Sequence, residues 1–423
     1  MVQDSTSMIL ETAAAAASVL LMGVCALRLL ARLAHVLRGQ ESACGQISRR
    51  FAPAKALWAA ACMGLLSRLL LYALGYAMYR LLGIGSDGFF VSFRPLWTHW
   101  DSQHYIGIAQ EGYTAVGDNR LRLVFFPLYP MLMRLLAPLT GGSAFASGIV
   151  ISLLCAAAAS ALTVDLAYMH IGCEGARRAL AYFLLSPLSV FLCCVYTESL
   201  FICLTLAAVC LLRRGRPYAA ALCGMASAFT RMPGVIVAGL FIIALLDKIP
   251  KREFNLRAVG ACAAQVMIVF CGLFAYWLVN YAVTGDPMTY LTYQRENWYQ
   301  EPGSFWRSTA NTVHYFFASA GEGDWLFTWG FQLVSMAAIY LMMAFCTPAL
   351  PFDLAAYSFV YVAVVLSPTW LLSGARYLYA LCTLPMMLAN LRVGKRGHVA
   401  LLAAHAALLA VWVFGYTIAI QVL

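Results

Sequence analysis

The chain has 423 residues, a mean hydropathy of +0.78 and only 11% charged residues, and its apolar runs recur from end to end. Runs of about twenty residues are what a helix needs to cross a bilayer, so the composition excludes a water-soluble enzyme. The runs are continuous and do not alternate, which excludes a transmembrane β-barrel. The net charge of +10 is typical of basic cytoplasmic loops, and we expect no nucleic-acid partner.

We therefore predict an all-α fold, a polytopic transmembrane helical bundle of about 11–13 spans. Two long connecting segments are left over, at residues 83–144 and 284–326. The expected spans, in chain order, cover residues 8–30, 56–82, 145–169, 179–195, 198–212, 217–231, 233–247, 258–282, 327–346, 354–372, 377–391 and 398–421.

The basic residues orient this bundle. If the N-terminus lies outside, the inside loops collect eighteen of the 28 Lys and Arg residues, and both long segments face outward. The first helix carries its arginines after the apolar run, unlike a signal peptide, so we expect it to be retained. We divide the chain into an extra N-terminal transmembrane helix with a basic cytoplasmic loop (1–55) and a main membrane domain (56–423). The inside residues are Arg28, Arg32, Arg38, Arg49, Arg50, Lys55, Arg177, Arg178, Arg213, Arg214, Arg216, Lys248, Lys251, Arg252, Arg257, Arg392, Lys395 and Arg396.

The first outer segment contains a polar and aromatic stretch, WTHWDSQHYIGIAQEGY, at residues 97–113. Asp101 lies at its centre, between His99 and His104 and beside several aromatic rings. A carboxylate in this position also suits the start of a helix, so helix capping is an equal alternative to a chemical role. Further along, residues 125–136 contain FFPLYP and a leucine stripe, which predicts a short helix lying in the membrane interface.

Several motifs resemble a known family. The stretch WDSQHYIGIAQEGY with FFPLYP is similar to the first outer loop of the PIG-V mannosyltransferases, which belong to the GT-C glycosyltransferase superfamily. The resemblance continues through about residues 57–392, and it implies a GT-C-like fold. Its later motifs are SPLSVFLCCVYTESLF (186–201), AFTRMPG (228–234), residues 294–298 and GARYL (374–378).

The resemblance implies transfer of a sugar from a polyprenyl-phosphate donor to a lipid-linked glycan or glycolipid acceptor, with the acid of the first outer loop at Asp101. Such a transfer needs a base for the acceptor hydroxyl and a positive site for the departing phosphate. We expect Asp101 to be the base, and its lack of a second fixed acid favours an inverting displacement. We expect Arg231 and Arg376 to bind the donor phosphate, although snorkelling at helix ends explains either one equally well.

Other residues are expected to contact the substrates. For Glu198, the alternative to substrate contact is capping the N-terminus of a helix. For Trp298, the alternative is anchoring at the membrane interface. Asp165 lies within a span, where an acid is either functional or solvated near the span's end. The spacing H-x-D-x-x-H offers no fourth metal ligand, so we expect no metal and no other cofactor. The substrate set is His99, Trp100, His104, Tyr105, Glu198, Gln294 and Trp298, and Arg295 and Arg307 are weaker phosphate candidates.

Two other functions remain open. One is a GT-C enzyme that uses a different polyprenyl-linked sugar, and the other is a transporter or flippase of polyprenyl lipids. Carriers tend to hold their ionisable residues near the middle of the bilayer, whereas this cluster lies in an outer loop. The chain has no N-x-S/T sequon and no ER retrieval signal, which favours a bacterial plasma membrane over the ER membrane.

Overall fold

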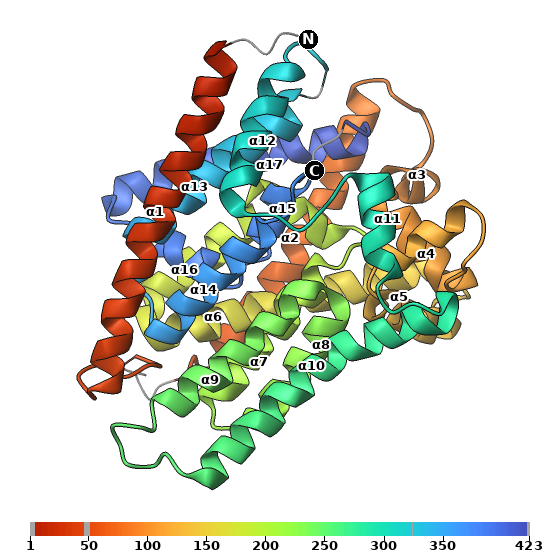
Figure 1. The fold of residues 1–423 in the computed structure, drawn as a ribbon. Coiled ribbons are helices and arrows are strands. Elements are labelled where there is room, and N and C mark those ends of the chain that lie inside the picture. Colours follow the sequence, from red (N-terminus) through yellow and green to blue (C-terminus); the bar gives the residue numbers. More distant parts are fainter. Residues whose placement is uncertain (1–4, 46–50, 324, 421–423) are drawn as a thin grey trace.

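The computed structural model describes residues 5–45, 51–323 and 325–420, so Arg49 and Arg50 of the basic loop lie outside it. Every regular element in these ranges is a helix, which confirms the predicted all-α fold (Figure 1). In the described part of the chain, six helical segments are long and apolar enough to cross a membrane, and the number is eight if each of two bent pairs counts as one span. The long segments are α1 (Ser5–Leu37), α2 (Ala54–Leu81), α6 (Ala144–Leu185), α10 (Leu256–Thr284), η5 with α13 (Leu326–Gly330 and Phe331–Phe345) and α17 (Gly394–Thr417).

The described residues contain fewer helices of spanning length than the 11–13 spans predicted from the sequence. Five predicted spans contain helices of only 6 to 16 residues. A 14-residue helix measures about 21 Å, less than the ~30 Å hydrocarbon core. Many of their apolar side chains pack inside the protein, and burial there gives the same apolar sequence signal as contact with lipid. These helices are α7 (Glu198–Arg213), α8 (Pro217–Thr230), α9 (Ala238–Leu246), α14 (Phe352–Val365), α15 (Gly374–Tyr379) and α16 (Leu384–Ala389).

Helix α6 is interrupted at Gly172, whose φ of 71° and ψ of −174° are not helical. The sequence predicts a break between residues 169 and 179, and this glycine lies within it. The 3₁₀ segment η3 (Pro187–Cys193) follows and turns through 98° into α7. This bent pair brings the first residue of α7 into the interior of the bundle.

The first of the two long segments, residues 83–144, which we expect to face outward, folds into short helices on one side of the molecule, where α11 of the second segment joins it (Figure 1). Helix α11 of the second segment packs on η1 of the first. The short helix predicted within residues 125–136 is present as α5, which begins at Leu128 inside the FFPLYP motif and exposes Leu135. The elements are α3 (Phe89–Leu96), α4 (Asp101–Glu111), η1 (Asp118–Val124), α5 (Leu128–Leu136), η2 (Ala137–Thr140), α11 (Thr289–Trp298) and α12 (Phe305–Ala318); η4 (Met232–Val237) and η6 (Thr347–Ala349) lie elsewhere.

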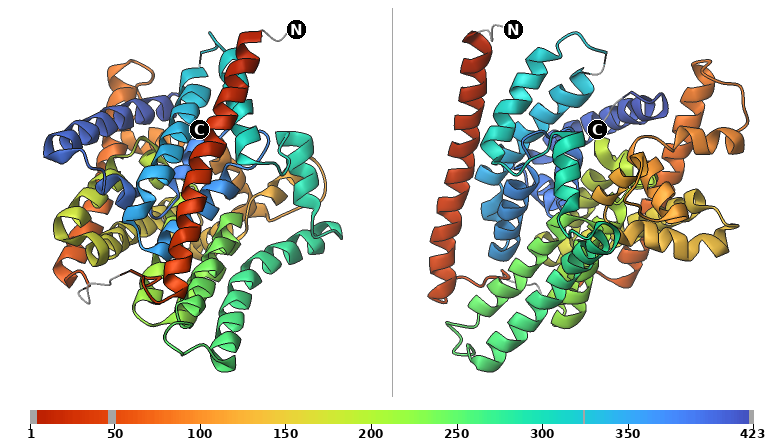
Figure 2. Two further views of the ribbon diagram at one scale, coloured as in Figure 1. Left: turned by 60° about the vertical axis from the view of Figure 1, so that its left-hand side comes forward. Right: turned by 45° about the vertical axis from the view of Figure 1, so that its right-hand side comes forward.

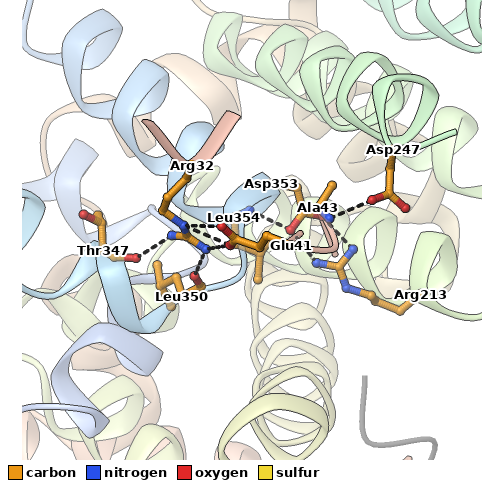
Figure 3. A network of polar contacts seen from close by, with 9 residues as sticks. All are labelled: Arg32, Glu41, Ala43, Arg213, Asp247, Thr347, Leu350, Asp353 and Leu354. Carbon is orange, nitrogen blue, oxygen red and sulfur yellow. Dashed lines mark hydrogen bonds and ion pairs between the residues drawn. The ribbon is translucent and has the colours of Figure 1, made fainter. Parts of the chain in front are cut away.

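The N-terminal helix α1 lies along one edge of the molecule, packed on α12, α13 and α14 (Figure 2). A network of polar contacts fixes the chain that follows it (Figure 3). Arg32 pairs with Glu41 and donates to the carbonyl of Leu350 at 3.0 Å. The backbone N–H of Ala43 donates to Asp247 at 2.8 Å, and its carbonyl accepts from the N–H of Asp353 at 3.0 Å.

Candidate active site

Asp101 is the first residue of α4, and the residue before it has an unusual backbone. Trp100 has a φ of 45° and a ψ of −116°, a positive-φ conformation that costs a non-glycine residue about 1–3 kcal/mol. No side-chain capping bond forms at this helix start. The Asp101 carboxylate instead accepts a hydrogen bond from Arg376, with 2.9 Å between Oδ2 and Nη2. The Asp101 side chain therefore forms an ion pair and does not cap the helix, which was the alternative that the sequence allowed.

Glu198 occupies the equivalent position at the start of α7. Thr197 precedes it without a side-chain capping bond, so the capping alternative fails here too. Its Oε1 lies 2.6 Å from Nη1 of Arg231 and 3.3 Å from Nε of Arg376. The side chain of Glu198 is only 1% exposed, which makes it the buried acid between two guanidinium groups.

Asp101, Arg376, Glu198 and Arg231 thus form one row of alternating charge, which we call the charge row. The carboxylates and guanidinium groups balance, so the charge row is neutral when all four are ionised. Its burial is uneven: Asp101 is 27% exposed, Arg231 13%, Arg376 6% and Glu198 1%. Arg376 is therefore not the solvated head group that snorkelling requires.

Aromatic rings enclose the two arginines. The guanidinium of Arg376 lies 5.1 Å from the ring centroid of Tyr196 and 5.4 Å from that of Phe191. Tyr377 lies between the arginines, 4.8 Å from Arg231 and 5.6 Å from Arg376. Cations over aromatic faces are stabilised by the ring quadrupole, and the rings keep water away from the charges.

Side chains of α2 and α6 hold the chain leading to Glu198 in place by donating hydrogen bonds to its backbone carbonyls. Arg68 of α2 is fully buried and donates to the carbonyls of Leu184 and Ser189, on either side of the junction between α6 and η3. Tyr72 donates to the carbonyl of Cys193, and Ser152 of α6 donates to that of Cys194 at 2.8 Å. These bonds satisfy carbonyls that an interrupted helix leaves unpaired, and so they fix the approach to Glu198.

Arg376 is fixed by the start of its own short helix. The N–H of Gly374 donates to Oε1 of Gln332 at 2.7 Å. A Cβ at residue 374 would lie 2.9 Å from that oxygen and 2.7 Å from the Leu371 side chain, so only glycine fits without a shift. A close packing contact thereby sets the position of α15 and of its arginine.

His99 and Trp100 surround a tyrosine of the last helix. Their ring centroids lie 5.1 Å and 5.3 Å from that of Tyr416, and Trp97 stacks on the same ring at 5.5 Å. The hydroxyl of Tyr196 donates to the carbonyl of His99 at 3.2 Å. Burial lowers the pKa of His99 below its ordinary value, so the imidazole is neutral at pH 7.

His104 and Tyr105 connect the site to the second outer segment. Both lie against Phe125, with centroid distances of 4.7 Å and 5.2 Å, and Phe125 contacts Trp298 of α11 at 6.4 Å. Burial lowers the pKa of His104, although the Asp101 carboxylate acts in the opposite direction. Trp298 is thus separated from Asp101 by two layers of rings.

The remaining predicted residues lie outside the charge row. Gln294 is half-buried on α11, and among the described residues its side chain has no hydrogen bond to the charge row. Arg295 is exposed and pairs with Glu301 at 3.2 Å, and Arg307 is exposed on α12. Asp165 is 1% exposed and pairs with Arg214 at the far end of α7, about 24 Å from Glu198 by helix length. Asp165 therefore has a structural ion pair, and it is not solvated.

Three residues near the charges were missed by sequence reasoning. Tyr196 and Tyr377 lie inside quoted motifs, next to residues that were selected, so proximity along the chain was an available signal. Tyr416 lies in an apolar terminal helix and carries no local signal. In the described ranges, no group of three or more His, Cys, Asp and Glu side chains is placed to hold a metal ion.

Comparisons with known proteins find one matching family model and several similar relatives. Residues 91–294 match the family model described as mannosyltransferase (PIG-V). The chain is 32% identical over 155 residues to GPI alpha-1,6-mannosyltransferase 2 of Cricetulus griseus, covering 34% of this chain and 31% of that protein. The Mus musculus and Homo sapiens proteins of the same name are 32% and 30% identical, with the same coverage. The chain therefore spans about a third of the length of these curated relatives, and no solved structure matches it.

Proposed function

Because residues 91–294 match the mannosyltransferase (PIG-V) family model, we propose that the chain is a membrane mannosyltransferase. The donor in this proposal is a polyprenyl-phosphate mannose, and the acceptor is a lipid-linked glycan or glycolipid. Catalysis takes place at the outer or lumenal face of the membrane. The plasma membrane of a bacterium is the favoured location, with the ER membrane as the eukaryotic equivalent.

The observation that supports this proposal most strongly is the charge row, whose most exposed member is Asp101. In the proposed reaction, the acceptor hydroxyl attacks the anomeric carbon of mannose while Asp101 takes up the hydroxyl proton. The bond between that carbon and the phosphate oxygen breaks, and polyprenyl phosphate leaves with the electron pair. Attack from the face opposite the phosphate inverts the anomeric centre.

Arg376 and Arg231 have a part in the same step. A guanidinium group can bind two phosphate oxygens at once and stabilise the charge that develops as the phosphate leaves. Both arginines are held by Glu198, which we assign as the residue that orients them. His99, Trp100, His104 and Tyr105 lie within four residues of Asp101 in the chain, and we assign them to contact with the sugar.

The test is a transfer assay with purified chain in liposomes, using labelled polyprenyl-phosphate mannose and a membrane lipid extract. Asp101→Asn is expected to reduce transfer by about 100-fold or more, since the base is lost. Asp118→Asn is the matched control, because Asp118 belongs to the same outer segment and its side chain is fully exposed. Native-rate transfer by Asp101→Asn would overturn the assignment of the base.

Sugar identity is tested by replacing the donor. Glucose and arabinose donors are offered to the native chain beside mannose, and the proposal requires that mannose is transferred fastest. If no donor supports transfer, movement of a fluorescent polyprenyl phosphate across the liposome membrane is measured instead. Movement of the lipid without sugar transfer would favour a transporter over an enzyme.

A further inference from the structure

We infer that the donor phosphate displaces Asp101 from Arg376, so that the charge row keeps Asp101 paired until a donor is bound. This inference rests on the proposed function, because it assigns a regulatory step to the same site. The ligand it concerns is the phosphate group of a polyprenyl phosphate. Asp101 would then be free to act as the base only when a donor is bound at the charge row.

The first observation is an incomplete hydrogen-bond set on Arg376. Its Nη2 donates to Asp101, and its Nε faces Glu198 at 3.3 Å. Among the described residues, its buried Nε makes no hydrogen bond of good geometry despite facing Glu198, and its buried Nη1 has no hydrogen-bond partner at all. A buried guanidinium N–H without a partner is costly, and this one lies beside the N–H that Asp101 occupies. A phosphate with two free oxygens could accept from Nη1 and Nη2 together.

The second observation is that Glu198 and Asp101 differ in burial and in the number of arginines that each contacts. Glu198 is 1% exposed and touches both arginines, so removing it would strand two buried cations. Asp101 is 27% exposed, and within the described ranges its carboxylate forms an ion pair with Arg376 alone. Of the two acids on Arg376, Asp101 is therefore the one that an incoming anion can replace.

The third argument is the charge balance. The charge row is neutral, and a bound phosphodiester would add one negative charge to a site lined by aromatic rings. If Asp101 stayed on Arg376, two anions would compete for one guanidinium, and like charges in such a site repel strongly. Once it is displaced, the Asp101 carboxylate loses its cationic partner and becomes a better proton acceptor. After transfer, departure of the phosphate lets Asp101 release its proton to water and pair with Arg376 again.

The test is the affinity of the purified chain in nanodiscs for polyprenyl phosphate, which carries no sugar and needs no turnover. Displacement predicts that Asp101→Asn binds polyprenyl phosphate about fivefold more tightly than the native chain, because a competing anion is gone. Asp101→Ala should tighten binding as well, and Asp118→Asn should leave it unchanged. Thermal unfolding is recorded for each variant, to establish that it is folded at the assay temperature.

The outcomes separate this inference from the proposed function. Unchanged or weaker binding by both Asp101 variants would overturn displacement, even if the native chain transfers mannose. Tighter binding by both variants would support displacement, even if no transfer is detected and the proposed function fails. Inorganic phosphate and phosphatidylglycerol serve as competitors. Tighter binding confined to polyprenyl phosphate supports a donor site, whereas equal tightening for phosphatidylglycerol overturns it in favour of a general lipid-phosphate site.

Discussion

Asp101 and Arg376 are 275 residues apart in the chain, yet Nη2 of Arg376 lies 2.9 Å from Oδ2 of Asp101. The contact joins the first outer segment to a short helix near the C-terminus. Arg376 also faces Glu198, so one guanidinium connects the starts of α4 and α7. The position of the proposed base thus depends on a residue that belongs to a distant part of the bundle.

This contact predicts that alanine and lysine substitutions of Arg376 affect stability and donor binding differently. Arg376→Ala leaves a buried Glu198 with one cation fewer, and breaking such a pair costs about 3–5 kcal/mol of unfolding free energy. Arg376→Lys keeps the charge but loses the planar fork, so we expect most of the stability and weaker donor binding. Thermal unfolding and separate titrations of donor and acceptor measure the two effects. Donor affinity equal to that of the native chain in Arg376→Lys would remove Arg376 from phosphate binding.

Glu198 should behave as an orienting residue. Glu198→Gln keeps the shape of the side chain but removes the charge that separates Arg231 from Arg376, so the two cations repel. We expect the unfolding free energy to fall by about 2–4 kcal/mol and donor affinity to fall with it. Glu174→Gln is the matched control, because Glu174 is 83% exposed and its pair with Arg178 is 3.7 Å long. If both glutamine variants unfold at the native temperature, the buried bridge has no stabilising role.

Much of the fold was predictable, but the short elements were not. The spans at 8–30, 56–82 and 258–282 correspond to α1, α2 and α10, because long lipid-facing helices carry an uninterrupted apolar signal. The predicted span at 377–391 is instead two six-residue helices, α15 and α16. Their apolar residues are buried against protein, and an apolar run does not distinguish protein burial from lipid contact.

The four members of the charge row were selected from the sequence, but their pairing was not predicted. Asp101, Glu198, Arg231 and Arg376 were all selected, since charges in an apolar chain stand out and their motifs resemble a family. Their pairing joins four elements that are far apart in sequence, and no local pattern encodes such a contact. Tyr416 was missed for the same reason, because its contacts with His99 and Trp100 exist only after folding.

The two histidines predict a loss of stability at acidic pH. Burial holds the pKa values of His99 and His104 below the value near 6.5 of an unfolded chain. As the pH falls below about 6.5, the unfolded chain takes up protons that the folded chain does not, so the folded state loses stability until the folded pKa is reached. His104→Phe keeps a ring against Phe125 and removes one titrating group. Its unfolding temperature should fall less between pH 7.5 and pH 5.5 than that of the native chain, and an equal fall would exclude His104 as a source.

The last prediction concerns the buried pair that anchors the N-terminal part of the chain. Arg213 and Asp353 are each 1% exposed and form two contacts, of 2.7 Å and 2.9 Å, beside the Ala43 backbone (Figure 3). Asp353→Leu or Arg213→Met alone leaves an unpaired buried charge and should cost about 3–5 kcal/mol of unfolding free energy. The double variant removes both charges, so it should be more stable than either single variant. Thermal unfolding of the four chains forms a double-mutant cycle, and additive losses would show that the two side chains act independently.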